Sequence, residues 1–339
     1  MAAFLQSPHE FLEDFIVHAL VATDRVWIQA MVFEVGAVSE RLCQVLIDAA
    51  RRGCDVRFQV DWNSSQYVDG ELRLLPEFDL KKRTYADKVH KTNENFYAVL
   101  RAAGVSVTIL NSPFIIARLF PIYKRNHTKL YIADGMGWMG GMNLYDEAFD
   151  NIDFMVRFDD SRIVSALIAQ FEQVNQNKPK KNYAIKLSEN YTFLADSGRN
   201  GESIIYDTAL ECIDGAIKSI VFVSQIVPEG VLLERLLLKA AAGIPITIIT
   251  SPRGENQFRK YPQKYFYDQF KKLVANNPNI HFTHLLNTLH AKLILVDSRI
   301  GLFGSHNFVE QGVLLGTEEI CMQTEDPQLI SQLTTFASL

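Results

Sequence analysis

A histidine, a lysine and an aspartate recur in this chain at one fixed spacing, and a glycine-rich turn follows each set. The first set is His127, Lys129 and Asp134, and the second, 163 residues later, is His290, Lys292 and Asp297. The turns contain Gly141 or Ser305 and end in Asn143 or Asn307. Two imidazoles, two ammonium groups and two amides are suited to binding a phosphate and to breaking and remaking a phosphodiester bond.

The two imidazoles can divide the chemistry at phosphorus between them. One neutral histidine can attack phosphorus as a covalent nucleophile. The other, once protonated, can give its proton to the leaving alcohol and later take one from an incoming alcohol or water. Opposite protonation states are accessible because imidazole titrates near neutral pH, although they belong to the coupled pair rather than to either ring. The lysines supply positive charge, so neither a metal ion nor a cofactor is expected.

The spacing predicts that these groups lie at the ends of buried strands. Residues two apart on a strand face the same side, so His127 and Lys129 should project together, as should His290 and Lys292. The aspartate of each set lies beyond a run of apolar residues that anchors the strand, where it should pair with a cation or hold a loop. The glycines let the backbone pass close to a ligand, and the asparagines can donate hydrogen bonds to phosphate oxygens.

Each half of the chain carries the same alternation of strands and helices. In the first half, strands are predicted at 26–33, 55–60, 105–110 and 129–133, and helices at 38–53 and 93–104. In the second half, strands are predicted at 220–227, 244–250, 280–285 and 292–296, and helices at 229–243 and 265–277. A further helix closes each half, at 161–177 and 326–339. This alternation predicts an α/β fold of two similar lobes, each a mixed β-sheet flanked by helices.

The duplication also predicts how the lobes are organised. The N-terminal lobe is expected at 1–177 and the C-terminal lobe at 204–339, with a linker at 178–203. A duplicated pair would be related by a pseudo-two-fold axis, with the two motifs meeting in an active site at the interface. Because both motifs are in one chain, a monomer is expected.

Two stretches of the first half have no counterpart in the second. Residues 62–91 are polar and include the basic run 81–83, whereas residues 113–123 are apolar and irregular. Both precede the first motif, so both should overhang the site. The basic run is either a solvated face or an attractor of anionic lipid headgroups, and the apolar stretch is either a core loop or a membrane-dipping element.

The amino-acid composition indicates which binding partners and which cellular compartment to expect for this protein. The 34 basic residues against 39 acidic ones give a net charge of −5, whereas proteins that grip nucleic acid usually carry a basic excess, so no nucleic acid partner is expected. The four cysteines form no CxxC pair, which favours reduced thiols in the cytoplasm. The N-terminus does not resemble a signal peptide, and no stretch reaches the roughly 20 apolar residues of a spanning helix.

The doubled motif resembles that of the phospholipase D superfamily. The signature of that superfamily, HxKxxxxD followed by G-[SG]-x-N, occurs here as HTKLYIAD with GGMN and as HAKLILVD with GSHN. The RNH at 125–127 and the GGMN followed by Asp146 and Glu147 are similar to the bacterial cardiolipin synthase branch. The similarity covers about residues 7–330 and includes the repeated strand–helix–strand units.

The resemblance implies a phosphatidyltransferase that acts on glycerophospholipids through a covalent phosphohistidine intermediate. It implies that His127 is the nucleophile and His290 the acid–base group. It also implies that Glu318 holds the motif histidine of the second half and that Asp153 does the same in the first half. The expected partner is a phospholipid, with the protein cytoplasmic and bound peripherally to a membrane surface.

Three other functions stay open at this point. A phospholipase D hydrolase would use water as the acceptor, and the motifs do not distinguish it from a transferase. A phosphodiesterase acting on nucleic acid is disfavoured by the acidic charge. A lipid-binding protein on the same scaffold would bind headgroups without either motif histidine.

Overall fold

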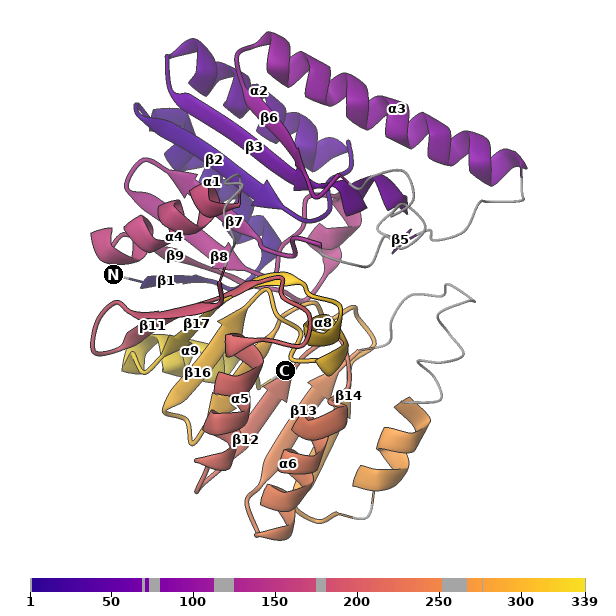
Figure 1. Cartoon of the computed structure of the whole chain (residues 1–339), viewed down its shortest axis with the longest axis vertical. Helices are drawn as coiled ribbons and strands as arrows, with labels where there is room; N and C mark the ends of the chain where they lie inside the picture. The colour runs from indigo at the N-terminus through magenta and orange to yellow at the C-terminus, as the bar shows by residue number, and fades with distance from the viewer. Residues whose placement is uncertain are drawn as a thin grey trace. The chain divides into compact units, whose positions relative to one another are not determined.

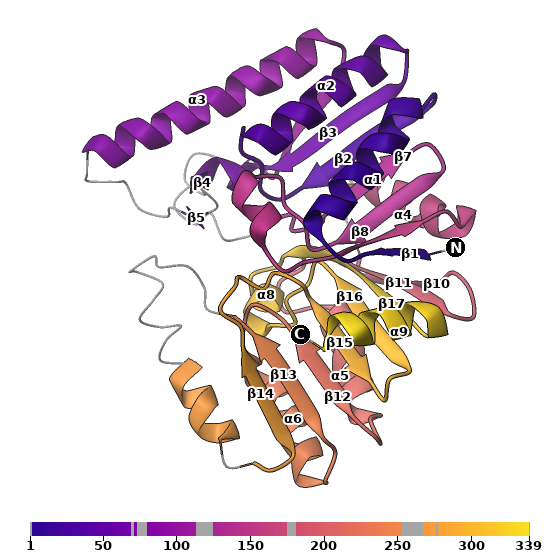
Figure 2. The same ribbon diagram turned by 180° about the vertical axis from the view of Figure 1, so that it is seen from behind.

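The computed structural model describes residues 2–68, 71–72, 80–112, 125–174, 181–251, 267–275 and 277–338. The chain divides into two compact units. One comprises Met1–Asp150 and Phe154–Lys180, and the other comprises Asn151–Asp153 and Lys181–Leu339. Each unit is built on its own mixed sheet with helices packed on it (Figures 1 and 2), which confirms the predicted α/β class.

The first unit contains a seven-stranded sheet in the order β1-β9-β8-β7-β2-β3-β6. Its strands are β1 (Ala2–Leu5), β2 (Arg25–Ala30), β3 (Asp55–Asp61), β6 (Ser106–Leu110), β7 (Leu130–Ala133), β8 (Met136–Gly140) and β9 (Met155–Phe158). Its helices are α1 (Pro8–Val21), α2 (Ala37–Arg51), α3 (Leu80–Ala102) and α4 (Ser161–Gln173), with short turns η1 (Trp62–Gln66) and η3 (Asp146–Asp150) and the pair β4 (Tyr67–Val68) and β5 (Glu71–Leu72). Strands β2, β3 and β6 run parallel, whereas β7 is antiparallel to β2.

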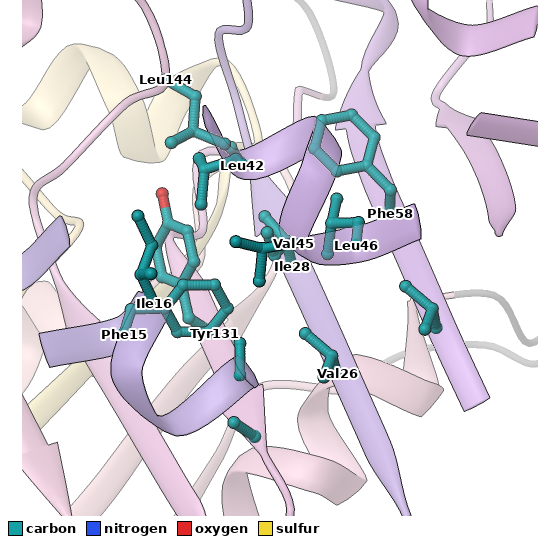
Figure 3. Close-up of a cluster of buried hydrophobic side chains, with 14 of the residues drawn as sticks. Phe15, Ile16, Val26, Ile28, Leu42, Val45, Leu46, Phe58, Tyr131 and Leu144 are labelled. Carbon is teal, nitrogen blue, oxygen red and sulfur yellow. The ribbon is translucent and has the colours of Figure 1, made fainter. Parts of the chain in front are cut away.

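The periodicity of α2 explains how the core of this unit forms. Leu42, Val45 and Leu46 recur on one face of the helix and are buried. Figure 3 shows them against Ile28 and Phe58 of the sheet, next to side chains of α1. Burying a side chain of this size stabilises a fold by about 1.5–3 kcal/mol. The apolar face of α2 therefore packs the helix firmly on the parallel strands of the sheet that precede the first motif in the chain.

The second unit contains an eight-stranded sheet in the order β10-β11-β17-β16-β15-β12-β13-β14. Its strands are β10 (Tyr183–Lys186), β11 (Tyr191–Ser197), β12 (Ile220–Val223), β13 (Ile246–Thr250), β14 (Ile280–His284), β15 (Leu293–Val296), β16 (Ile300–Gly304) and β17 (Glu318–Thr324). Its helices are α5 (Ile204–Asp214), α6 (Gly230–Ala241), a helical segment at 267–274, α8 (Glu310–Leu314) and α9 (Pro327–Phe336). As in the first unit, the motif strand β15 is antiparallel to the first parallel strand, β12.

Two sequence predictions need correction. The expected linker at 178–203 is wrong for its middle part, because β10 and β11 lie there and β11 pairs along its length with β17. Helix α3 begins at Leu80 rather than near residue 93, since its first turns carry few apolar residues and so show no core-facing period. The apolar stretch 113–123 and the side chains of 81–83 lie outside the described residues.

None of the helices in the described part of the chain has the length and apolar character needed to cross a membrane.

Candidate active site

The first motif lies in the first unit, immediately before β7. His127 is 7% exposed and the Lys129 side chain is fully buried. A buried ammonium group needs a hydrogen-bond acceptor, and the Lys129 Nζ donates to the carbonyl oxygen of His127 at 2.6 Å. The Lys129 side chain is therefore anchored on the main chain of the motif histidine.

The amide of Asn143 is oriented by the backbone of the neighbouring loop. Its Oδ1 accepts a hydrogen bond from the Val32 N–H at 3.3 Å, and the residue is 5% exposed. With the oxygen used in this way, the NH₂ group is the part that can donate to an anion. This arrangement fits the predicted role of Asn143 as a donor to phosphate oxygens.

The second motif lies in the second unit, before β15, and shows how an imidazole can be fixed in one tautomer. His290 Nδ1 lies 2.8 Å from the Asp153 Oδ2, and the Asp153 side chain is 1% exposed. A buried carboxylate accepts this bond, so Nδ1 carries a proton and Nε2 is the ring nitrogen that can exchange one. Lys292 Nζ lies 3.0 Å from the same Nδ1, but it also donates to the His290 carbonyl oxygen. The carbonyl oxygen is the acceptor of the Lys292 ammonium group, because a protonated Nδ1 cannot accept.

The partner of Asp153 differs from the sequence expectation, which assigned this residue to the histidine of the first half. Residues 151–153 belong to the second unit. The Ile152 N–H donates to the Thr288 carbonyl at 2.8 Å, and the His290 N–H donates to the Ile152 carbonyl at 2.9 Å. These two bonds place Asp153 beside His290.

Glu318 is buried in β17, opposite Ser197 of β11. Its predicted assignment to the motif histidine of the second half stays a prediction. Asn307 follows the second turn, and its carbonyl oxygen accepts a hydrogen bond from the Ser224 hydroxyl at 3.2 Å.

The glycines that open the two turns are required by the neighbouring strand. A Cβ atom on Gly140 would lie 2.5 Å from the Phe154 carbonyl oxygen, and one on Gly304 would lie 2.2 Å from the Ile320 carbonyl oxygen. Both distances are far inside van der Waals contact. At these two positions the absence of a side chain serves strand packing, whereas the sequence analysis related the glycines of the turns to close approach of a ligand.

His306, inside the second turn, has a structural role. It is 2% exposed, and its Nδ1 accepts a hydrogen bond from the Phe308 N–H at 2.8 Å. Burial lowers the pKa of His306, although the nearby Glu319 carboxyl opposes this shift. The ring is therefore neutral and holds the turn.

Two residues that the sequence analysis missed hold the chain just before each motif histidine. The Asp61 carboxylate, at the end of β3, accepts a hydrogen bond from the Asn126 N–H at 2.6 Å. Ser251, just after β13, uses its Oγ to accept from the Leu289 N–H at 2.7 Å. The repeat offers a signal for both, because each residue lies at the C-terminal end of the corresponding parallel strand, Asp61 as its last residue and Ser251 directly after it.

The motif aspartates hold loops, which is one of the two roles predicted for them. Asp134 accepts hydrogen bonds from the N–H groups of Thr23, Asp24 and Arg25 at 2.9–3.0 Å. Asp297 does the same for three successive N–H groups, those of Ile217, Lys218 and Ser219. Burial alone would raise the pKa of each carboxyl, but the backbone donors outweigh it and lower both pKa values.

An Asp134→Ala variant is expected to lower the free energy of unfolding by about 1–2 kcal/mol, since three N–H groups lose one acceptor. Because the pKa of Asp134 is lowered in the folded state, this stabilisation is present above the unfolded-state pKa and is lost as pH falls through the folded value. Urea denaturation at pH 7 and pH 3 measures both effects. Asp24→Ala, which removes an exposed ion pair with Arg25, is the matched control, and equal losses in the two variants would contradict the assignment.

A family model described as "Cardiolipin synthase, PLD-like domain" matches residues 16–175 and 209–339. The chain belongs to this phospholipase D-like family. The match spans both units and both motifs, and it confirms the resemblance seen in the doubled motif.

Several cardiolipin synthases are similar to this phospholipase D-like chain. The minor cardiolipin synthase ClsB of Bacillus subtilis is 20% identical over 248 residues, covering 69% of this chain and 60% of that protein. The major cardiolipin synthase ClsA of the same organism is 24% identical over 310 residues, covering 84% and 58%. Cardiolipin synthase A of Wigglesworthia glossinidia brevipalpis is 23% identical over 338 residues, covering 93% and 63%. The chain thus spans about three-fifths of the length of these curated relatives.

Solved structures share the phospholipase D-like fold. Phosphatidylserine synthase of Haemophilus influenzae Rd KW20 superposes with a TM-score of 0.76 at 13% identity, covering 99% of this chain and 85% of that one. Polyphosphate kinase of Porphyromonas gingivalis gives a TM-score of 0.65 at 12% identity, covering 100% of this chain and 50% of that one. At these identities the likeness concerns the fold alone.

Proposed function

We propose that this chain is a phosphatidyltransferase of the cardiolipin synthase type, which forms a phosphohistidine intermediate. The observation that carries the proposal is the motif of His, Lys and Asn, intact in each unit of a chain that belongs to the cardiolipin synthase-like family. A chain that had lost catalysis would be under no pressure to keep His, Lys and Asn in both copies.

The proposed reaction has two steps. A ring nitrogen of His127 attacks the phosphorus of the lipid, the bond to the leaving alcohol breaks, and His290 gives its proton to that alcohol. The second alcohol then passes its proton to His290 and attacks phosphorus, and the phosphorus–nitrogen bond breaks. Lys129 and Lys292 offset the charge on the phosphate oxygens.

The carboxylate of Asp153 supports the acid–base assignment of His290. It accepts the Nδ1–H bond at 2.8 Å, so the other ring nitrogen is the one that takes up and releases the proton. A buried carboxylate on Nδ1–H also stabilises the imidazolium that forms during the reaction, as in other catalytic His–Asp pairs.

The proposed substrate is a glycerophospholipid such as phosphatidylglycerol, with cardiolipin as the product. Cardiolipin synthases among the relatives support this choice of lipid. We further propose that the protein is a monomer that works at the cytoplasmic surface of a membrane and binds no nucleic acid.

Acid quenching tests the chemistry and the substrate class together. The protein is mixed with vesicles of phosphatidylglycerol that carries a labelled phosphatidyl group, quenched with acid, denatured, and mapped for label. Label on His127 that is absent from His127→Ala is the expected result, whereas turnover without any labelled histidine would contradict the covalent step.

Product analysis distinguishes the two acceptors. Cardiolipin as the main product identifies a transferase, and phosphatidic acid that does not decline when glycerol-containing acceptors are added identifies a hydrolase. Binding to vesicles that survives removal of both motif histidines, with no turnover in the wild type, would identify a lipid-binding protein.

A further inference from the structure

A buried pair of carboxyl groups lies behind the turn of the second motif. Asp196 of β11 and Glu319 of β17 are direct cross-strand partners, and they are 3% and 4% exposed. Side chains directly opposite each other on antiparallel strands have Cβ atoms about 4.5–5.5 Å apart on one face of the sheet. Two acids are thus close together in the interior of the second unit.

Glu319 links this pair to the turn. The Ser305 Oγ donates to the Glu319 Oε2 at 2.5 Å and accepts from the Ile320 N–H at 3.0 Å. Ser305 also uses its own N–H to bind the Ile320 carbonyl at 2.9 Å. The Glu319 carboxyl therefore helps to fix the residue that lies two positions before Asn307.

Asp196 takes its hydrogen bonds from uncharged groups at the start of α5. The Ser203 Oγ lies 2.5 Å from its Oδ2, and the Ile204 N–H donates to its Oδ1 at 2.8 Å. Neutral donors stabilise a buried carboxylate less than a cation would, and the adjacent Glu319 adds like charge. The Ile205 N–H also donates to Oδ1, at 3.4 Å. These donors favour the carboxylate, as they do at Asp134 and Asp297, but Asp196 is more deeply buried than either and lies opposite Glu319, so its ionised form is unfavourable.

We propose that Asp196 is a positioning residue that stays protonated beside Glu319, and that its ionisation loosens the Gly304–Asn307 turn. The role is to keep the Glu319 carboxyl where it holds Ser305, without a second negative charge next to it. A test of this effect by enzymatic activity rests on the proposed function, whereas a test by stability does not.

The other titratable groups around the pair do not change charge near pH 7. Burial lowers the pKa of His306, raises the pKa of Cys321 well above its usual range, and raises the pKa of Cys212 to about 11. Tyr206 of α5, next to His306, has its pKa raised by burial. Burial, with a contribution from Glu319, raises the pKa of Asp196 to about 7.

Because the pKa of Asp196 is raised in the folded state, its contribution to the free energy of unfolding decreases as pH rises. A carboxyl whose pKa is higher in the folded than in the unfolded state stabilises the fold fully below the unfolded-state pKa, and that stabilisation is lost as pH rises through the folded value of about 7. Asn cannot ionise, so this loss should vanish in Asp196→Asn.

Thermal unfolding of the full chain from pH 5 to pH 8 tests the proposal without any substrate. The melting temperature of the wild type should fall relative to that of Asp196→Asn by about 4–8 °C over this range. Glu325→Gln, which changes an exposed acid directly after β17, should follow the wild type. The same pH dependence in the wild type and Asp196→Asn would overturn the proposal.

Two further measurements keep the test decisive. Infrared spectra of the wild type should show a protonated carboxyl band that disappears near pH 7, and Glu319→Gln should move that midpoint to lower pH. A midpoint that does not move in Glu319→Gln would contradict the pairing. If Asp196→Asn does not fold, the spectra of the wild type and Glu319→Gln still test whether Asp196 is protonated beside Glu319.

The activity readout separates this inference from the proposed function. In phosphatidyl transfer assays, the ratio of the rate at pH 8.5 to that at pH 6.5 should be higher in Asp196→Asn than in the wild type. If neither protein transfers phosphatidyl groups but the melting curves differ as expected, the proposed function fails while the role of Asp196 stands. Identical rate ratios in two active proteins would show that Asp196 does not act on the turn.

Discussion

A His127→Ala variant is expected to transfer phosphatidyl groups about 10⁴–10⁶-fold more slowly than the wild type, because it lacks the proposed nucleophile. His290→Ala is expected to lose about 10²–10⁴-fold, the usual contribution of a positioned acid–base group. The double variant should be no slower than the slower single variant, since the two residues act on one reaction. Initial rates with labelled phosphatidylglycerol vesicles measure all three.

The control for both variants is His281→Ala. His281 lies on β14 with an exposed ring, hydrogen-bonded to Thr283 at 3.2 Å, and its loss should leave the rate unchanged. Thermal unfolding of each variant tests whether it remains folded. Transfer within tenfold of the wild type in either folded motif variant would refute the proposed mechanism.

Asp153→Asn is expected to reduce the rate of transfer by about 10²–10⁴-fold while the protein stays folded, because an amide can donate to Nδ1 and so stabilise the wrong tautomer of His290. The change removes one charge and preserves the shape of a side chain that is 1% exposed. Both the maximal rate and the shape of the pH–rate profile should change in Asp153→Asn. Replacement of a purely structural residue would alter the stability of the protein alone.

Asp153→Glu completes this test. The longer side chain keeps the carboxylate, so it should recover part of the activity lost in Asp153→Asn. Equal activity in the wild type and Asp153→Asn would show that the 2.8 Å contact with His290 is not used in the reaction.

The sequence predicted the parts of the site that repeat. Each histidine and lysine pair precedes a strand of four buried residues, LYIA or LILV, whose apolar character is visible without a structure. The parallel strands and α2 and α6 were also predicted, because their periodicity is strong and a glycine follows each helix.

The features that escaped prediction depend on contacts between distant segments. Asp153 and His290 are 137 residues apart, and their pairing follows from a short backbone bridge between Ile152 and Leu289 that no local pattern indicates. Asp196 was also missed, since an acid in a lysine-containing, glycine-rich region is typical of a linker. Only the pairing of β11 with β17 shows that its side chain is buried.

The three residues Asn151–Asp153 belong to the second unit although the chain on both sides of them belongs to the first. A gene fragment that starts at Lys181 would therefore encode the whole second sheet, but its product would contain His290 without the carboxylate of Asp153. The duplicated halves are for this reason not interchangeable modules, and severed halves could regain a complete imidazole–carboxylate pair only by reassembling with each other.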